Sequence, residues 1–236
     1  MDDGGFRPGA HPLRTRALQM GRQVVAKDIH VVAHTQSQHH VGGLVGGWYD
    51  SALTDLGRRQ ADAVAARIAE LVGDRRPIEV YSSDLLRAAQ TAEPIAARLA
   101  APVTHWPDLR ERSYGVAGGK PSAWLDGRVV FAGRDGDRLD HRDIEGAETR
   151  RELMTRIYRA MDRIAASPCA TQVVVTHGFA MTFVVAAWIR MPLESAGWVS
   201  FRSNAGGITH LREDDELFDR AVVALNDRTH LAGVPG

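Results

Sequence analysis

The sequence predicts a three-layer α/β/α sandwich built on a mixed, mostly parallel sheet. The first observation is an alternation of short apolar runs with amphipathic helical stretches that starts at Asp28, as expected where helices join the strands of one sheet. The second observation is size. A chain of 236 residues suits a single domain whose core needs neither a disulfide nor a metal to fold.

The first half of the chain supplies two strands and two helices. Residues 29–33 are apolar apart from His30 and predict a buried strand that ends before His34. Thr54 can cap a helix that continues to about Val72, because apolar residues recur along it at helical spacing. Residues 78–81 predict a second strand, and residues 82–84 offer caps for a helix over residues 85–99.

The second half continues the alternation. We expect a helix over residues 148–166, a β-branched strand over 172–176 and an apolar helix from 178 to about 190. Shorter strands are expected near residues 198–202, 207–212 and 221–225. Residues 115–145 contain many glycines and charges with weak periodicity, which is typical of a lid or specificity insert.

The termini and the charge balance limit the classes of function. Residues 1–27 show no sustained apolar period and predict a flexible N-terminal extension, which leaves residues 28–236 as the folded domain. Lys+Arg and Asp+Glu both number 29, so no overall basic field favours nucleic acid or an anionic membrane as a partner. We expect a small-molecule substrate and allow for a homodimer.

Location follows from the apolar runs and the cysteine count. The longest uninterrupted apolar stretch, residues 183–189, is far shorter than the roughly 20 residues that span a bilayer. Cys169 is the single cysteine, so no intramolecular disulfide can form and a reducing cytoplasm is expected.

Four chemically active side chains are expected at one edge of the sheet. His34 and His177 each follow a predicted strand, and ligands bind beyond the carboxyl ends of parallel strands. Arg87 lies one turn into a helix and points back toward that edge. Glu111 follows the next short extended piece. An imidazole can attack phosphorus, a guanidinium can bind phosphate oxygens, and a carboxyl can protonate a leaving oxygen.

A metal is not expected. The histidines at positions 30, 34, 39, 40 and 177 raise the question, but their spacing is not that of a usual zinc site. We therefore expect neither a metal nor another cofactor.

Six short motifs then resemble one known family, the histidine phosphatase superfamily, which is also called the phosphoglycerate mutase-like family. They lie in the expected order at residues 34–37, 47–57, 81–92, 146–149, 175–178 and 225–231. The resemblance implies that His34 is the phosphorylated nucleophile and that His177 stabilises the transferring group. It further implies that Arg87 binds phosphate, that Glu111 is the general acid and that Ser37 assists through its hydroxyl. Tyr114 belongs to the segment 111–115, which resembles the corresponding loop of the mutases, and is expected to line the substrate pocket.

Three positions depart from the family pattern. Ala33 stands where the motif has an arginine that binds phosphate, His40 stands where asparagine is usual, and Leu44 stands where the mutases carry another arginine. A hydrogen bond to a charged group contributes about 1.5–3 kcal/mol, so the loss at position 33 is substantial. His40 as a cation, Lys120 or Arg112 could compensate, or nothing does.

Three functions remain open at this stage. The first is hydrolysis of a phosphomonoester of a small metabolite through a phosphohistidine. The second is the same fold adapted to acid/base chemistry on an unphosphorylated metabolite, as a lyase, isomerase or hydrolase. The third is a binding module without catalytic activity.

Overall fold

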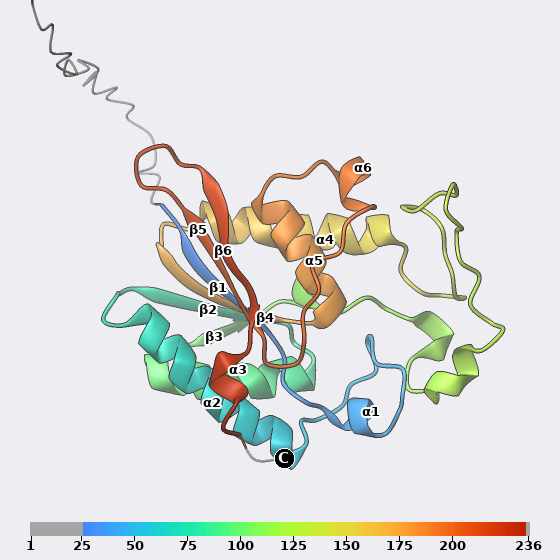
Figure 1. Ribbon diagram of the computed structural model, residues 1–236, viewed down its shortest axis with the longest axis horizontal. Coiled ribbons are helices and arrows are strands. Elements are labelled where there is room, and N and C mark those ends of the chain that lie inside the picture. Colours follow the sequence, from blue (N-terminus) through green and yellow to red (C-terminus); the bar gives the residue numbers. More distant parts are fainter. Residues whose placement is uncertain (1–25, 235–236) are drawn as a thin grey trace, which may run out of the picture.

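The computed structural model describes residues 26–234 and confirms the α/β/α architecture (Figure 1). Its six-stranded sheet has the order β3-β2-β4-β1-β5-β6. The strands are β1 (Asp28–Ala33), β2 (Ile78–Ser82), β3 (Val103–His105), β4 (Thr171–Thr176), β5 (Ile208–Glu213) and β6 (Arg220–Asp227). The strands β1 to β4 are parallel, whereas β5 is antiparallel to β1 and β6 to β5, so the sheet is mixed and mostly parallel.

Two layers of helices cover the sheet. The helices are α1 (Gln38–Val41), α2 (Asp55–Val72), α3 (Leu86–Leu99), α4 (Arg150–Ala166), α5 (Gly178–Trp188) and α6 (Leu193–Ala196). The apolar faces of α2 and α3 pack on one side of the sheet, and those of α4 and α5 pack on the other (Figure 1). The strand β4 carries no exposed residue, as expected for a central strand covered on both faces.

Local capping explains where two long helices begin. Thr54 precedes α2, and its hydroxyl accepts a hydrogen bond from the backbone N–H of Gly57 at 2.9 Å, as the sequence predicts. Thr149 precedes α4 and forms a capping box with Glu152. The caps expected at residues 82–84 are not used, because α3 begins after Leu85 without a side-chain cap.

One predicted strand is wrong. Residues 198–202 form no strand; instead the backbone of Phe201 bonds twice to the hydroxyl of Thr182 on α5. Phe201 therefore packs against the core beside α5 rather than extending the sheet, and Trp198 is exposed.

The segment expected as an insert is a long loop with two short 3₁₀ turns, Gly115–Ala117 and Ser122–Leu125. Backbone hydrogen bonds join Val45 to Gly119 and Lys120. A small apolar cluster closes the loop over the 43–50 segment, and its buried members are Val45, Ala117, Ile144 and Ala147. The loop is thus packed next to the segment that follows His34.

The expectation for the N-terminal extension falls mainly on residues 1–25, which lie outside the described residues. Lys27 is buried, and its ammonium donates to the carbonyl oxygens of Ser167 and Cys169. Within residues 26–234, no helix has the length and apolar character needed to cross a bilayer.

Candidate active site

The two histidines expected at strand ends lie together. The last residues of β1 and β4, Ala33 and Thr176, are register partners in neighbouring parallel strands. His34 and His177 follow them directly, and their ring centroids are 5.1 Å apart in an edge-to-face arrangement. Both side chains are buried. The sheet register therefore brings the two imidazoles to one point, as the sequence predicts.

Arg87 joins this pair from α3. Its guanidinium is fully buried, and Nε donates to Nε2 of His34 at 3.2 Å. Its other two nitrogens donate to the carbonyl oxygens of Gly47 (2.6 Å) and Tyr49 (3.0 Å). These backbone acceptors fix the plane of the guanidinium, and each terminal nitrogen retains a second N–H for a ligand.

The hydrogen bonds of His34 define its tautomer. Its Nδ1 lies 2.8 Å from the carbonyl oxygen of Thr35, which can only accept, so Nδ1 carries the proton and Nε2 carries the lone pair. Burial, followed by the positive charge of Arg87, holds the pKa of His34 well below 6.5. The imidazole is therefore neutral near pH 7, as a nucleophile requires.

His177 is oriented by a hydroxyl. Its Nε2 lies 2.8 Å from Oγ of Ser83, which follows β2. Its Nδ1 is buried and has no hydrogen-bond partner among residues 26–234. Burial and the charge of Arg87 also hold the pKa of His177 well below its usual 6.5. A buried polar atom without a partner is costly, so a bound ligand that pairs with Nδ1 would remove this cost.

Glu111 is held at the start of α5. Its carboxylate accepts hydrogen bonds from the backbone N–H groups of Phe179 (2.9 Å), Ala180 (3.1 Å) and Arg112 (2.8 Å). Burial nevertheless raises the pKa of Glu111 above its usual 4.5, against the opposite effect of these N–H donors and of Arg87. Because α5 begins directly after His177, the carboxyl group lies beside the paired imidazoles.

The backbone of Glu111 is fixed as well. Its carbonyl oxygen accepts from the indole of Trp48 and from the guanidinium of Arg156, both at 2.7 Å. Arg156 also donates to the carbonyl oxygens of Asp108 and Arg110 and to both carboxylate oxygens of Glu148. One side chain on α4 therefore shapes the whole loop that presents Glu111.

Ser37 and His40 lie on the other side of His34. The rings of His34 and His40 stack at 5.3 Å with 13° between their planes. The hydroxyl of Ser37 lies 3.0 Å from Nδ1 of His39 and 3.3 Å from Nδ1 of His40, and Ser51 completes this group through His39 at 2.7 Å. Ser37 therefore contacts these two imidazoles rather than His34.

Among the residues that the structure describes, no nearby side chain replaces the arginine that the family motif has at position 33. Ala33 is only 2% exposed and offers no side-chain donor. Burial and the charge of Arg87 lower the pKa of His40 below 6.5, so His40 does not replace the missing positive charge at neutral pH. Arg112 is committed to Asp143 and to the carbonyl oxygen of Glu148, and Lys120 is exposed on the 115–145 loop.

Tyr114 lies between two cavities beside this centre. One of about 300 Å³ lies against Trp48 and Tyr49, and the other of about 520 Å³ is bounded by the 115–145 loop and Phe179. Arg112, Arg138 and Arg150 also line the larger cavity. Tyr114 is thus placed where it can contact a molecule that reaches Glu111.

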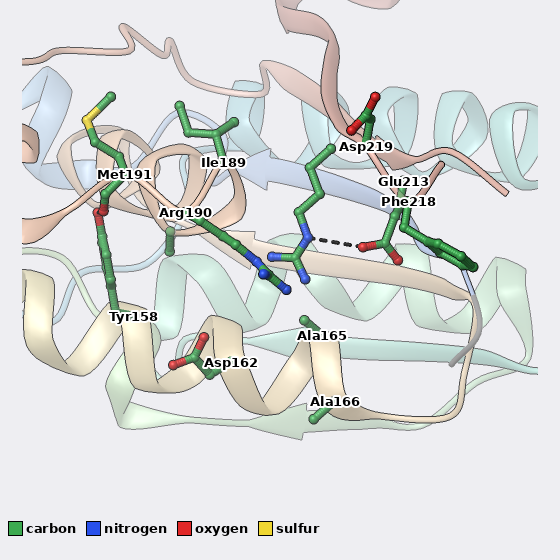
Figure 2. Close-up of a pocket in the computed structure, with 12 residues that line it drawn as sticks. Tyr158, Asp162, Ala165, Ala166, Ile189, Arg190, Met191, Glu213, Phe218 and Asp219 are labelled. Carbon is green, nitrogen blue, oxygen red and sulfur yellow. Dashed lines mark hydrogen bonds and ion pairs between the residues drawn. The ribbon is translucent and has the colours of Figure 1, made fainter. Parts of the chain in front are cut away.

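A larger cavity than these two lies elsewhere in the described residues (Figure 2). It has a volume of about 880 Å³ and lies among the ends of α4 and α5 and the β5–β6 turn. Glu213 lines this cavity and directly follows Arg212, the residue of β5 that pairs with Asp28 at the start of β1. This cavity is therefore at the opposite edge of the sheet from His34.

Sequence reasoning missed two groups that position the site. Ser83 belongs to the 81–92 motif, but its position before a helix predicts a helix cap and gives no sign of its contact with His177. Arg156 is one of many arginines in the chain, and no local pattern distinguishes it.

Comparison with known proteins agrees with this geometry. The histidine phosphatase superfamily (branch 1) matches residues 29–228. The chain belongs to this superfamily. It is 30% identical over 213 residues to a metal-independent phosphoserine phosphatase of Arabidopsis thaliana, covering 88% of this chain and 84% of that protein. It is also 29% identical over 202 residues to a glucosyl-3-phosphoglycerate phosphatase of Mycolicibacterium vanbaalenii, covering 79% and 86%.

Solved structures of the superfamily share the fold. A mycobacterial glucosyl-3-phosphoglycerate phosphatase superposes with a TM-score of 0.68 at 26% identity, covering 86% of this chain and 100% of that chain. These relatives support a phosphatase-type function and a hydrolase-like enzyme at the level of the superfamily.

Proposed function

We propose that this protein hydrolyses a phosphomonoester of a small metabolite through a phosphohistidine formed on His34. The observation that carries the proposal is the neutral imidazole of His34, whose Nε2 lone pair lies 3.2 Å from Nε of the buried Arg87 and beside His177. We place this activity in the cytoplasm, since the free Cys169 is the single cysteine.

In the first step Nε2 of His34 attacks phosphorus, and the bond from phosphorus to the leaving oxygen breaks. The remaining N–H groups of Arg87 and Nδ1 of His177 pair with the phosphoryl oxygens. Such positioned donors supply most of the catalysis in phosphoryl transfer, because the transition state spreads negative charge over these oxygens.

Glu111 serves both steps. Its raised pKa favours a carboxylic acid that gives its proton to the leaving oxygen. The resulting carboxylate then takes a proton from water as that water attacks phosphorus. The nitrogen–phosphorus bond breaks, phosphate leaves, and His34 and Glu111 return to their starting states.

A second candidate rests on Ala33. The buried methyl group leaves the centre with one guanidinium, and that guanidinium already donates to three acceptors of the protein. A less positive centre with His34, His177 and Glu111 fits acid/base chemistry on an unphosphorylated metabolite.

The direct test is hydrolysis of p-nitrophenyl phosphate by the purified protein. We expect turnover that His34→Ala abolishes and that the exposed control His105→Ala leaves unchanged. Absence of hydrolysis, together with absence of vanadate or phosphate binding, would reject the proposal.

The variant Ala33→Arg separates the two candidates. If the centre handles phosphate, a second guanidinium increases phosphatase turnover by about 10²–10³, the effect typical of one transition-state donor. Unchanged turnover in a variant that melts like the parent protein would favour the second candidate.

A further inference from the structure

A second group of ligand-type side chains lies far from His34, on strands β1 and β5. His30 and His210 are cross-strand partners, and their rings stack with centroids 4.6 Å apart. The carboxylate oxygen Oδ1 of Asp28 lies 2.8 Å from Nε2 of His210 and 3.4 Å from Nε2 of His30. Asp28 is six residues before His34 along β1, a separation of about 20 Å.

The same face of the sheet carries all three side chains. Side chains alternate along a strand, so Asp28, His30 and Val32 share one face of β1. Val32 packs in the apolar cluster formed with α2, and Ile208 does so from β5. The three ligand-type groups therefore face the C-terminal half of α2, at the edge of that cluster.

His30 is buried without a hydrogen bond, although its ring lies beside Asp28 and His210. Its side chain is 1% exposed, and neither ring nitrogen has a hydrogen-bond partner among the residues that the structure describes. Buried polar atoms in native proteins nearly always have a partner. An apolar residue would fill this position between Val32 and the start of β1 without that cost, so a ligand that binds Nε2 accounts for a histidine here.

The donor atoms suit a divalent transition metal. The three ligand atoms lie within 4.8 Å of one another. Ligand atoms of a tetrahedral zinc ion, at about 2.0–2.1 Å from the metal, are about 3.3 Å apart. The spacings of 2.8 and 3.4 Å to Oδ1 of Asp28 are close to this value, and the two histidine nitrogens lie within 4.8 Å of each other.

The surroundings leave an approach open and hold the carboxylate. The side chains of Asp28 and His210 are 17% and 21% exposed, so water can reach the group and complete the coordination. Arg75 donates to Oδ2 of Asp28 at 3.1 Å, which orients the carboxylate and leaves Oδ1 for the metal, as outer partners of metal ligands do. The other nearby arginine, Arg67, pairs with Glu70.

We propose that Asp28, His30 and His210 bind one divalent transition metal ion of the zinc type, which links β1 to β5. The proposed site lies outside the catalytic centre, so metal binding can be measured without an assay of enzymatic activity. Nitrogen and carboxylate ligands suit Zn²⁺, and Co²⁺ can replace it as a spectroscopic probe.

The test is a titration of chelator-treated full-length protein with Zn²⁺ and with Co²⁺. Calorimetry measures the binding of either ion, and the visible spectrum reports the coordination of cobalt. We expect one ion per chain and a melting temperature that rises by about 5–10 °C when free zinc is about 100 times the dissociation constant. His210→Ala and Asp28→Asn should each weaken binding by at least tenfold.

Two controls make the result specific. His105→Ala removes an exposed histidine outside the group, and His40→Asn removes one from the cluster around His34; both should retain the binding of the parent protein. The melting temperature in the presence of chelator shows whether each variant is folded. Asp28→Asn keeps the size of the side chain, whereas His210→Ala shortens it, so the two variants together separate loss of a ligand atom from loss of packing. Absence of binding by the parent protein overturns the proposal. So does binding that survives in His210→Ala and Asp28→Asn but is lost in His40→Asn.

Discussion

At the scale of single residues, the active centre depends on protonation states set by burial. His34 and His177 are neutral because their pKa values lie well below 6.5, and the pKa of Glu111 is raised. His34, the proposed nucleophile, therefore has a lone pair near pH 7, and burial favours the protonated form of Glu111. The proposed phosphohistidine mechanism requires both of these states.

Glu111→Gln tests the acid/base role. We expect the rate of p-nitrophenyl phosphate hydrolysis to fall by about 10²–10⁴, because amide nitrogen cannot transfer the proton. In the parent protein kcat/KM should fall as pH rises through the raised pKa of Glu111. This limb should vanish in the variant, and the exposed Glu145→Gln should behave as the parent protein does. An unchanged pH profile in Glu111→Gln would show that another group is the acid.

Ser83→Ala tests the orientation of His177. Without the hydroxyl at 2.8 Å, the imidazole loses its bond at Nε2, and we expect kcat to fall by about tenfold with KM little changed. Ser83→Thr retains a hydroxyl and should restore most of the rate. Equal losses in both variants would indicate a packing role for Ser83 and no part in orienting His177.

At the scale of elements, the ends of β1 and β4 position the centre, and this part of the site was predictable. The apolar runs before His34 and His177 identify two strands, and parallel strands end at one edge of a sheet. The partner of His177 was not predictable, because Ser83 fits a local helix cap as well as it fits a contact across the sheet. Likewise, the segment 198–202 has the pattern of a strand, and only its contact with Thr182 on α5 decides otherwise.

The start of α4 gives a stability prediction. The hydroxyl of Thr149 accepts from the N–H of Glu152 at 3.2 Å, and the carboxylate of Glu152 accepts from the N–H of Thr149 at 2.7 Å. Thr149→Ala should lower the free energy of unfolding by about 1 kcal/mol and the melting temperature by about 2–4 °C. Thr104→Ala, at an exposed position of β3, is the matched control. A melting temperature equal in both variants would contradict the capping role.

The start of β1 makes stability depend on pH. The pKa of His30 is about 4 in the folded protein and 6.5 in an unfolded chain, so between these values the unfolded chain binds more protons. Stability is therefore lost as pH falls from 6.5 toward 4, by up to about 3 kcal/mol from this group. Among the charged groups that face His30, His210, Arg75 and Arg67 lower its pKa, whereas the carboxylate of Asp28 raises it.

His30→Leu isolates this contribution. Urea unfolding at pH 7 and at pH 4.5, with a chelator present, should show a smaller loss of stability at low pH in the variant than in the parent protein. The other buried histidines titrate in both proteins, so their effects cancel in the comparison. A loss of the same size in both proteins would exclude His30 as the source.

At the scale of the whole molecule, the fold follows from patterns that span the chain, whereas two features depend on contacts between distant positions. Asp28 and His210 are 182 positions apart, and nothing local to either residue indicates that β5 brings them together. Arg156 reaches the Glu111 loop from a helix that begins almost forty residues later. Periodicity predicts the elements and their ends, but it does not predict which polar side chains meet across them.

The measurement that tests the central claim most directly is a search for the phosphorylated intermediate. The protein is mixed with p-nitrophenyl phosphate, quenched in alkali, which preserves phosphohistidine, and analysed by peptide mass spectrometry. The account predicts one phosphoryl group on the peptide that contains His34, and none in His34→Ala. Hydrolysis that proceeds in the parent protein with no phosphoryl group on His34, or with the group on another residue, would contradict it.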